Sequence, residues 1–308
     1  MVREALGLMR PRSGGVYCDG TAGQGGHALA LLEASGPASR LLAIDRDAGA
    51  VQRVRELLAP YGHRAIVVHA RFGELPDVLA RLGLGRLDGV LVDLGVSSVQ
   101  LDDPERGLSF QRRGPLDMRL DRSHGEAADA LIDRLSEREL ADVIHAYGEE
   151  RRARSVARAI KAARRDGELR DTLDLAEVVR RAVGARRSGR IDAATRSFQA
   201  LRMAVNDELG ELEGLLAALP ELLSDGGRAV FICFHSLEDR AVKRAVRSWS
   251  GCRCEPRLPR CGCGGPVLKP VTGGKPLRPR EDEVDENPRS RSARLRAAER
   301  VPRVEAVA

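Results

Sequence analysis

The sequence predicts an α/β protein with a doubly wound parallel sheet into which an all-helical segment is inserted. Three observations lead to this prediction. Strand-like apolar runs alternate with helical segments over residues 16–93, three of these runs end in an aspartate, and one further buried run follows a long arginine-rich helical stretch. Such alternation is typical of parallel sheets, which bind ligands at the carboxyl ends of their strands.

The first strand and its glycine loop occupy residues 16–28. An apolar run ends at Asp19, and a glycine-rich loop then leads into an alanine- and leucine-rich helix. The loop glycines are Gly20, Gly23, Gly25 and Gly26. Glycine lets the backbone turn sharply and approach a ligand closely, and the first amides of a helix are free to bind that ligand. By itself the pattern is equally compatible with an ordinary strand-to-helix turn.

Three more strands are predicted at residues 41–45, 65–70 and 87–93, with helices at 48–58 and 75–82 between them. Each strand is a short apolar run, and each helix repeats its apolar residues at helical spacing. Because the strands alternate with helices, they are expected to be parallel and to end at the same edge of the sheet.

Asp19, Asp45 and Asp93 close three of these strands, so the sequence predicts an acidic ligand site at that edge. Asp45 lies about 20 residues beyond the glycines, the spacing at which a doubly wound fold places a carboxylate to accept hydrogen bonds from ribose hydroxyls. The glycines do not form a regular G-x-G-x-x-G motif, which argues against a dinucleotide. A nucleoside-bearing cofactor in general is therefore expected.

An inserted domain is predicted over residues 101–195. An ordered loop lying over the sheet edge is expected at 94–121, and helices rich in Ala, Leu and Arg follow. Residues 151–200 contain 14 Lys and Arg against 6 Asp and Glu, a net charge of +8, whereas the whole chain carries +6. This concentration predicts a phosphate-binding surface, and solvated helix faces are the alternative.

The sheet domain is predicted to resume after the insert, so that it comprises residues 1–100 and 196–250. A long helix over 195–219 precedes a buried strand over 228–234, which ends at His235. A basic arm is predicted over 251–308. It contains Cys252, Cys254, Cys261 and Cys263, whose C-x-C spacing is tighter than that of usual zinc sites, so we assign no metal and favour free thiols or a redox-sensitive turn.

Composition restricts the class of protein. Aromatic residues make up 3% of the chain, which argues against recognition by rows of stacked rings, and the modest basic excess suits a polyanionic partner or an arginine-rich solvated surface. No apolar run approaches the length of a membrane span, and residues 1–15 lack the apolar core of a signal peptide. A cytoplasmic protein without disulfides is therefore expected.

These motifs together resemble the bacterial MraW (RsmH) family, which methylates the N4 amine of a cytidine in small-subunit ribosomal RNA. The resemblance extends over residues 16–297. The matching blocks are Asp19-Gly-Thr with Gly25-Gly-His27, Asp93-Leu-Gly-Val-Ser-Ser-Val-Gln100, Arg106-Gly-Leu-Ser-Phe110, Gly114-Pro-Leu-Asp-Met-Arg-Leu-Asp121, Ala194-Thr-Arg-Ser-Phe-Gln-Ala-Leu-Arg202, Val205-Asn-Asp-Glu-Leu209, Phe234-His-Ser-Leu-Glu-Asp-Arg240 and Asn287-Pro-Arg-Ser-Arg-Ser-Ala293.

The resemblance implies a doubly wound Rossmann-like methyltransferase sheet, S-adenosylmethionine as methyl donor and an inserted RNA-recognition domain. The cofactor contacts that it implies are Gly25, Gly26, His27, Asp45, Phe72, Asp93 and Gln100. Phe72 is expected against the adenine ring, with a core position as its alternative. Ala22 and Gln24 depart from the family's denser glycine run and are expected at the outer turn of the loop.

The implied reaction moves a methyl group from a sulfonium to an amine whose lone pair is delocalised into a ring. The enzyme must therefore orient and polarise the amine with hydrogen-bond acceptors, and it needs no strong base. Asp93 is expected to accept from the amine, from the cofactor's amino group or from both, and His235 is a second catalytic candidate. The target base must leave its stack.

The implied partner is small-subunit ribosomal RNA as an assembled particle, and family analogy allows a homodimer. Two other functions were weighed. A nicotinamide-dependent oxidoreductase predicts a tighter glycine motif than this chain has. A non-catalytic RNA-binding assembly protein has no need for acids at three strand ends.

Overall fold

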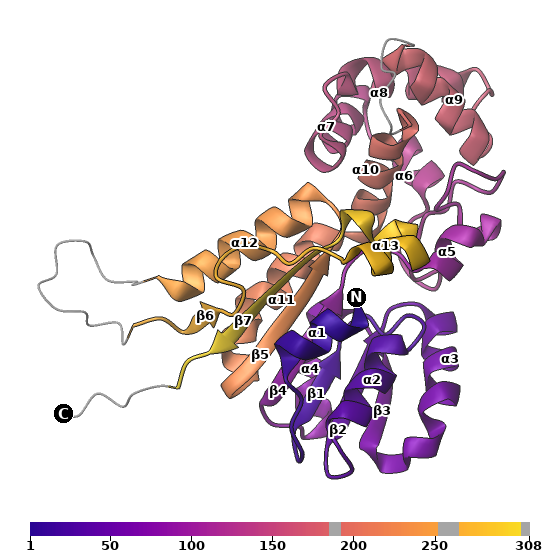
Figure 1. Cartoon of the computed structure of the whole chain (residues 1–308). Helices are drawn as coiled ribbons and strands as arrows, with labels where there is room; N and C mark the ends of the chain where they lie inside the picture. The colour runs from indigo at the N-terminus through magenta and orange to yellow at the C-terminus, as the bar shows by residue number, and fades with distance from the viewer. Residues whose placement is uncertain (185–191, 252–264, 303–308) are drawn as a thin grey trace, which may run out of the picture. The chain divides into compact units, whose positions relative to one another are not determined.

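The computed structural model describes residues 1–184, 192–251 and 265–302 (Figure 1). The chain divides into two compact units. The sheet unit comprises Met1–Gly95 and Leu209–Ala308, and the helical unit comprises Val96–Glu208. Within the described ranges, no helix is both long and apolar enough to cross a membrane.

One mixed sheet organises the sheet unit. Among the described residues its strands follow the order β3-β2-β1-β4-β5-β7-β6, with β1 to β5 parallel and β7 antiparallel to β5 and β6. The strands are β1 Val16–Asp19, β2 Arg40–Asp45, β3 Ala65–His69, β4 Leu87–Asp93, β5 Leu223–Cys233, β6 Leu268–Pro270 and β7 Arg294–Arg300. The order reverses between β1 and β4, which confirms the predicted doubly wound α/β fold.

Helices cover both faces of this sheet and bury it in two apolar cores. One core combines Leu31 and Val54 of α2 and α3 with strand residues such as Leu91. The other combines Val78 of α4 and Leu215 of α11 with the opposite faces of the strands. The helices of this unit are α1 Val2–Met9, α2 Gly26–Ala34, α3 Ala48–Leu58, η1 Ala59–Arg64, η2 Phe72–Glu74, α4 Leu75–Leu82, α11 Glu208–Leu222, α12 Ser236–Ser250, α13 Glu281–Glu286 and η4 Pro288–Ser292.

The C-terminal segment is part of the sheet, and the predicted separate arm over 251–308 is wrong for residues 265–302. β7 pairs with β5 along its length, and Leu295 is fully buried. The strand was not predicted because its arginines made the segment resemble an exposed basic arm. Arg296 and Arg300 are almost fully buried, and their guanidinium groups meet Asp239 at 2.7 Å and Asp225 at 3.3 Å.

The helical unit has a core of its own, built from residues such as Ile144, Ile160 and Val179. Its elements are α5 Ser98–Asp102, η3 Pro104–Arg106, α6 Ala128–Arg134, α7 Glu137–Gly148, α8 Ala153–Arg165, α9 Thr172–Val183 and α10 Ala194–Asn206. An independent core explains why an insert of this size folds without disturbing the sheet order.

The insert's boundaries differ from the predicted 101–195. The predicted single helix over 195–219 is broken at Asp207, whose φ of +48° ends α10. The side chain of Asn206 binds the backbone of Met118 and Leu120 at 2.8 Å, which ties the end of α10 into the helical unit. The apolar periodicity continues across Asp207, and for this reason the break was not visible in the sequence.

Candidate active site at the carboxyl edge of the sheet

Three aspartates meet at the carboxyl edge because their strands are neighbours. Asp19 ends β1, which lies between β2, ending at Asp45, and β4, ending at Asp93. Backbone amides that could neutralise them come from the loop after β1 and from the start of α2. The edge therefore gathers carboxylates at the switch point of the sheet, where doubly wound folds bind ligands.

Asp19 is fully buried, and burial raises the pKa of its carboxyl to about 7. The amide of Thr21 donates to its Oδ1 at 3.1 Å and opposes this rise, whereas the nearby charges of Asp93 and Asp45 add to it. Oδ2 of Asp19 has no hydrogen-bond partner among the described residues.

Asp45 fixes the glycine loop. Its Oδ2 accepts from the amide of Gly23 at 2.7 Å, and its Oδ1 accepts from the amide of Asp47 at 2.8 Å. Burial raises its pKa, and these two amides oppose the rise. Gly23 has a φ of +52°, a conformation that favours glycine. Each carboxylate oxygen retains a second lone pair for a ligand hydroxyl.

Asp93 and His27 face one another across the edge. The imidazole Nδ1 lies 3.7 Å from Oδ2 of Asp93, and the amide of Asp93 donates to the hydroxyl of Thr21 at 2.6 Å. Burial raises the pKa of Asp93 to about 7 and lowers that of His27 to about 4, so His27 is neutral at pH 7. Oδ1 of Asp93 and Nε2 of His27 have no hydrogen-bond partner in the described part of the chain.

In the glycine loop, a side chain would fit at Gly26 but not at the neighbouring Gly25. Gly25 has a φ of +81°, and a Cβ there would clash with the side chain of Leu57. A Cβ on exposed Gly26 would meet no atom within 4 Å, so the backbone at the start of α2 is open to a ligand. Gln24 is exposed as predicted, but Ala22 is buried in the core, so its predicted place at the outer turn is wrong.

Phe72 stands at the beginning of η2, directly after β3. It is 9% exposed and belongs to the apolar core, and a Cβ on Gly20 would lie 3.2 Å from its Cβ. The core position, which was the alternative for Phe72, is therefore found, and its predicted contact with the adenine ring stays a prediction. The small exposed part of the ring is what remains for a ligand.

His235 follows β5 and caps α12. Its Nδ1 accepts from the amide of Glu238 at 3.5 Å, and its Nε2 lies 2.9 Å from Oε1 of that residue. Oε2 of Glu238 accepts from the amide of Phe234 at 2.8 Å. Through the pairing of β4 with β5, Asp93 lies opposite Ile232, three residues before His235. The two catalytic candidates thus end adjacent strands.

Gln100 belongs to the helical unit. Its side chain closes a capping box at the start of α5, in which Oε1 accepts from the amide of Ser97 at 2.9 Å. The residue is 8% exposed. Its assignment to the cofactor site stays a prediction.

The cysteines separate into two groups. Cys18 and Cys233 are free and fully buried, and burial raises the pKa of each thiol, in line with their position in apolar strands. The tail cysteines, at which no metal was predicted, lie outside the described residues. They are Cys252, Cys254, Cys261 and Cys263.

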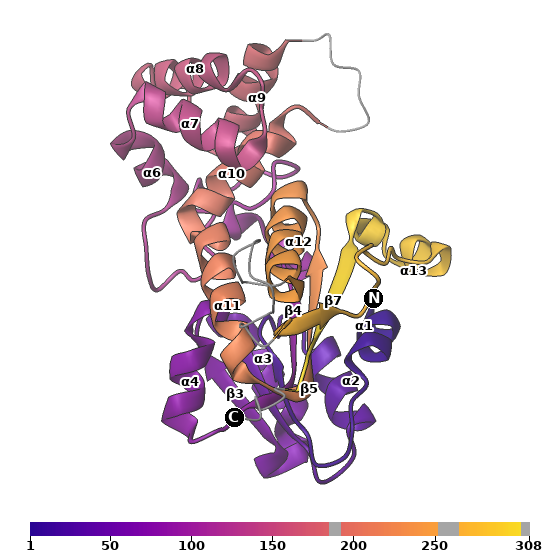
Figure 2. The same ribbon diagram turned by 90° about the vertical axis from the view of Figure 1, so that its left-hand side faces the viewer.

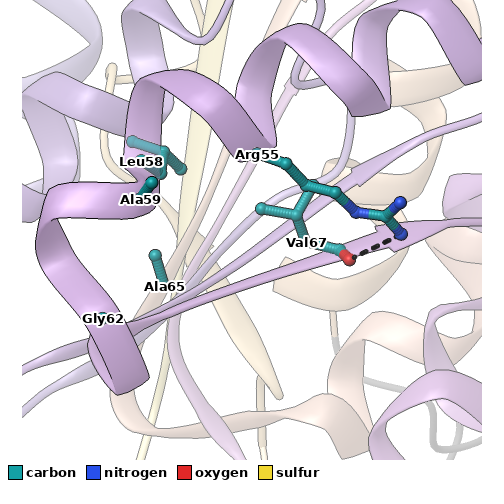
Figure 3. Close-up of a pocket in the computed structure, with 6 residues that line it drawn as sticks. All are labelled: Arg55, Leu58, Ala59, Gly62, Ala65 and Val67. Carbon is teal, nitrogen blue, oxygen red and sulfur yellow. Dashed lines mark hydrogen bonds between the residues drawn. The ribbon is translucent and has the colours of Figure 1, made fainter.

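A shallow pocket of about 160 Å³ lies elsewhere, between α3 and the edge strand β3 (Figure 3). The guanidinium of Arg55 donates to the carbonyl of Val67 at 3.5 Å across its wall. The pocket shares no residue with the acidic edge. Its lining consists of Arg55, Leu58, Ala59, Gly62, Ala65 and Val67.

The acidic edge fits S-adenosylmethionine. Its buried orphan atoms are Oδ2 of Asp19, Oδ1 of Asp93 and Nε2 of His27. Unsatisfied polar atoms of this kind are costly in a folded protein unless a ligand or water completes them. Carboxylate acceptors match the amino group, the hydroxyls and the positive sulfonium of that cofactor, and open Gly26 admits it to the backbone.

Sequence reasoning missed residues that position the site. The hydroxyl of Thr21 holds the backbone of Asp93, while its amide holds Asp19. The buried ion pair of Arg46 with Glu211, at 2.9 Å, ties the end of β2 to α11, and Glu211 also accepts from the amide of Gly73 at 3.3 Å. Only the partner found across the fold distinguishes these residues from ordinary loop and surface residues.

Comparison with known proteins identifies the family of this chain. The sequence profile of the MraW methylase family matches residues 1–301. The chain is 53% identical to the ribosomal RNA small subunit methyltransferase H of Sorangium cellulosum, over 99% of this chain and 91% of that protein. It is 50% identical to the protein of the same name from Geotalea uraniireducens, over 98% and 97%.

A solved structure of an rRNA methylase from Streptococcus thermophilus covers 98% of this chain and 94% of its own, with 9% identity and a TM-score of 0.42. Similarity at this level adds nothing to the assignment, which depends on the family match and on the identity to the relatives. On that basis the chain belongs to the MraW methylase family and is an S-adenosylmethionine-dependent methyltransferase.

Proposed function

We propose that this chain transfers the methyl group of S-adenosylmethionine to the N4 amine of a cytidine in small-subunit ribosomal RNA. The relatives that it matches over almost its whole length are ribosomal RNA small subunit methyltransferases. The single observation that carries the proposal is the acidic edge, where Asp19, Asp45 and Asp93 end three neighbouring strands, and where one oxygen of Asp19 and one of Asp93 have no hydrogen-bond partner among the described residues.

Residues from the three strand ends hold the cofactor in this proposal. Asp45 accepts from the ribose hydroxyls, because its carboxylate is fixed by two backbone amides and retains free lone pairs. Gly25, Gly26 and His27 contact the methionine part at the start of α2. Phe72 presents the exposed part of its ring to the adenine, and Gln100 stays a predicted cofactor contact.

The cofactor supplies a methyl group activated by a sulfonium. Asp93 accepts a hydrogen bond from the target amine, which polarises the amine and directs its lone pair. When bound, the cofactor would supply the methyl group and keep the electron pair of its carbon–sulfur bond, and the amine would release one proton. An Asp93 with a pKa of about 7 is able to take that proton near neutral pH and pass it to solvent.

His235 is the second candidate for orienting the base. Its imidazole contacts both the amide and the carboxylate of Glu238, so it is already engaged in capping α12. This engagement supports a positioning role for His235 and leaves Asp93 as the acceptor.

We assign substrate recognition to the helical unit as an RNA-recognition domain. Its exposed Arg138, Arg151 and Arg154 have no ion pair among the described residues, so they are available to phosphates. An assembled small-subunit particle, rather than free RNA, is the proposed substrate, with the protein in the cytoplasm and a homodimer as its proposed state.

Incubation of the full chain with labelled S-adenosylmethionine and unmodified small-subunit particles tests the function. The expected product is N4-methylcytidine at one site. Label in another nucleoside, or transfer only to protein, would overturn the proposal. Thermal-shift measurements with S-adenosylmethionine and NAD form a control, since an oxidoreductase would be stabilised by NAD.

A further inference from the structure

Helix α12 separates its charges onto two faces. Its acids, Glu238 and Asp239, are 4% and 7% exposed. Its basic residues are all exposed, and the two middle ones each lie three or four residues from the first and the last, which places all four on one side of the helix. We call this set the α12 stripe, and it consists of Arg240, Lys243, Arg244 and Arg247.

The two acids of α12 have their partners on the buried face of the helix. Glu238 accepts from the amide of Phe234 and contacts His235, as described above. Asp239 pairs with Arg294 at 2.9 Å and with Arg296 at 2.7 Å, both from β7. Arginines from the sheet, and not those of the helix itself, therefore neutralise this carboxylate.

Three residues of the stripe lack such compensation among the described residues. Lys243, Arg244 and Arg247 form no ion pair with any described residue, and the guanidinium of Arg244 donates to the carbonyl of Arg240 at 3.4 Å. Like charges three and four residues apart destabilise a helix. Folding alone gives no reason for this arrangement, so its partner is expected to be an external polyanion.

Packing fixes the direction in which the stripe faces. Ala241, Val242 and Trp249 are buried on the opposite side of α12 and join the core against the sheet. Figure 2 shows the helix lying beside β5 and β7, and it also contacts β6. The basic side chains are thus held on a rigid element with their charges in solvent.

The stripe also begins beside the acidic edge. α12 starts at Ser236, directly after the carboxyl end of β5, so Arg240 lies about one helical turn from His235. From Arg240 to Arg247 the stripe extends for about 10 Å along the helix. A nucleic acid strand whose base enters the acidic edge would have its flanking backbone within reach of the stripe.

We propose that the α12 stripe binds the sugar–phosphate backbone of the substrate RNA next to the target nucleotide. The inference rests on the proposed function, since it requires an RNA substrate at the acidic edge. Contacts of this kind fix the register of the strand and carry no sequence information themselves. The sheet unit therefore contributes RNA affinity of its own, apart from that assigned to the helical unit.

The test replaces Lys243, Arg244 and Arg247 together by Gln in the full chain. Because three phosphate contacts are lost, the slope of log affinity against log salt is expected to fall by about 2, and the KM for small-subunit RNA to rise about tenfold. kcat and the affinity for S-adenosylmethionine should not change. The single variant R247Q should give a partial effect in the same direction.

A matched triple variant, R40Q/R81Q/R86Q, removes the same charge at exposed arginines near the amino ends of the strands, away from the acidic edge. It should retain the KM and the salt slope of the parent protein. Since removing like charges relieves repulsion within α12, the stripe variant is expected to fold with an unchanged or higher Tm.

Equal KM and salt slope in the stripe variant and its parent would overturn the inference. A higher KM for assembled particles with unchanged affinity for free RNA would also overturn it, because the stripe would then bind a protein. Failure of the proposed function looks different, since the parent protein itself would not methylate the RNA.

Discussion

The acids at the carboxyl edge and those of the helical unit have pKa values that shift in opposite directions. Burial raises the pKa of Asp19 and Asp93 to about 7. In the helical unit, hydrogen bonds from Arg164 lower the pKa of Asp133, and those from Arg180 lower that of Asp192. At the carboxyl edge, Asp19 and Asp93 are shifted by burial and are available to a ligand. In the helical unit, hydrogen bonds from arginines stabilise the ionised carboxylates.

The same contrast applies to the arginines. Most described arginines between residues 151 and 184 meet an acid of their own unit, so a high count of basic residues does not by itself create a phosphate-binding surface. The paired ones are Arg158, Arg164, Arg165, Arg170, Arg180 and Arg181. α12 has fewer basic residues, but its Lys243, Arg244 and Arg247 form no ion pair with the part of the chain that the structure describes.

Replacing Asp45 by Ala at the carboxyl edge is expected to have the largest effect. Two hydrogen bonds from ribose hydroxyls to a carboxylate are lost, each worth about 1.5–3 kcal/mol, so the affinity for S-adenosylmethionine should fall about 100-fold or more. Calorimetric titration measures it. D45N keeps an oxygen for the amide of Gly23 and should show a smaller loss. Affinity of D45A within a few fold of the parent would refute the ribose role.

The pH dependence of cofactor binding is expected to be smaller in size. A positively charged cofactor favours the ionised form of Asp93, so affinity for S-adenosylmethionine should rise about tenfold from pH 6 to pH 8, across a pKa of about 7. D93N should flatten the profile, and what remains reports Asp19. An identical profile in the variant and its parent would contradict the assignment.

Stability should depend on pH in the opposite sense. The folded-state pKa of Asp19 and Asp93 lies above the ordinary 3.8, so their ionisation destabilises the ligand-free fold. Their contribution is fully present below about pH 4 and is lost as pH rises through about 7. The lowered acids of the helical unit contribute above their ordinary pKa and lose their contribution only in stronger acid.

The smallest effect is expected in the helical unit. Asp117 accepts a hydrogen bond from Arg119 at 2.7 Å and is 7% exposed. Burial raises the pKa of its carboxyl, but the hydrogen bonds from Arg119 outweigh this and lower it. D117N should destabilise the helical unit by about 1 kcal/mol, measured by hydrogen exchange of its amides. D133N, at an exposed pair, is the control and should change little. Loss of cofactor binding in D117N would break the comparison.

Much of the site could be predicted because its signals are local. Strand ends, glycines and acids follow from short patterns, and Asp19, Asp45 and Asp93 lie where those patterns place them. Ala22 could not be placed, because its burial depends on a core formed by distant segments. Thr21 carried no signal, since its hydroxyl acts on the backbone of Asp93, 72 residues away.

The sequence by itself determined the fold class, the acidic edge and the family, because periodicity, strand-end acids and motif blocks are properties of contiguous residues. Only the tertiary structure decided which charges remain unpaired. It buried the arginines of β7 against Asp239 and Asp225, and it left the α12 stripe exposed. The physical reason is that the free energy of a charge depends on its burial and on its partners, and both are set by residues far away in the chain.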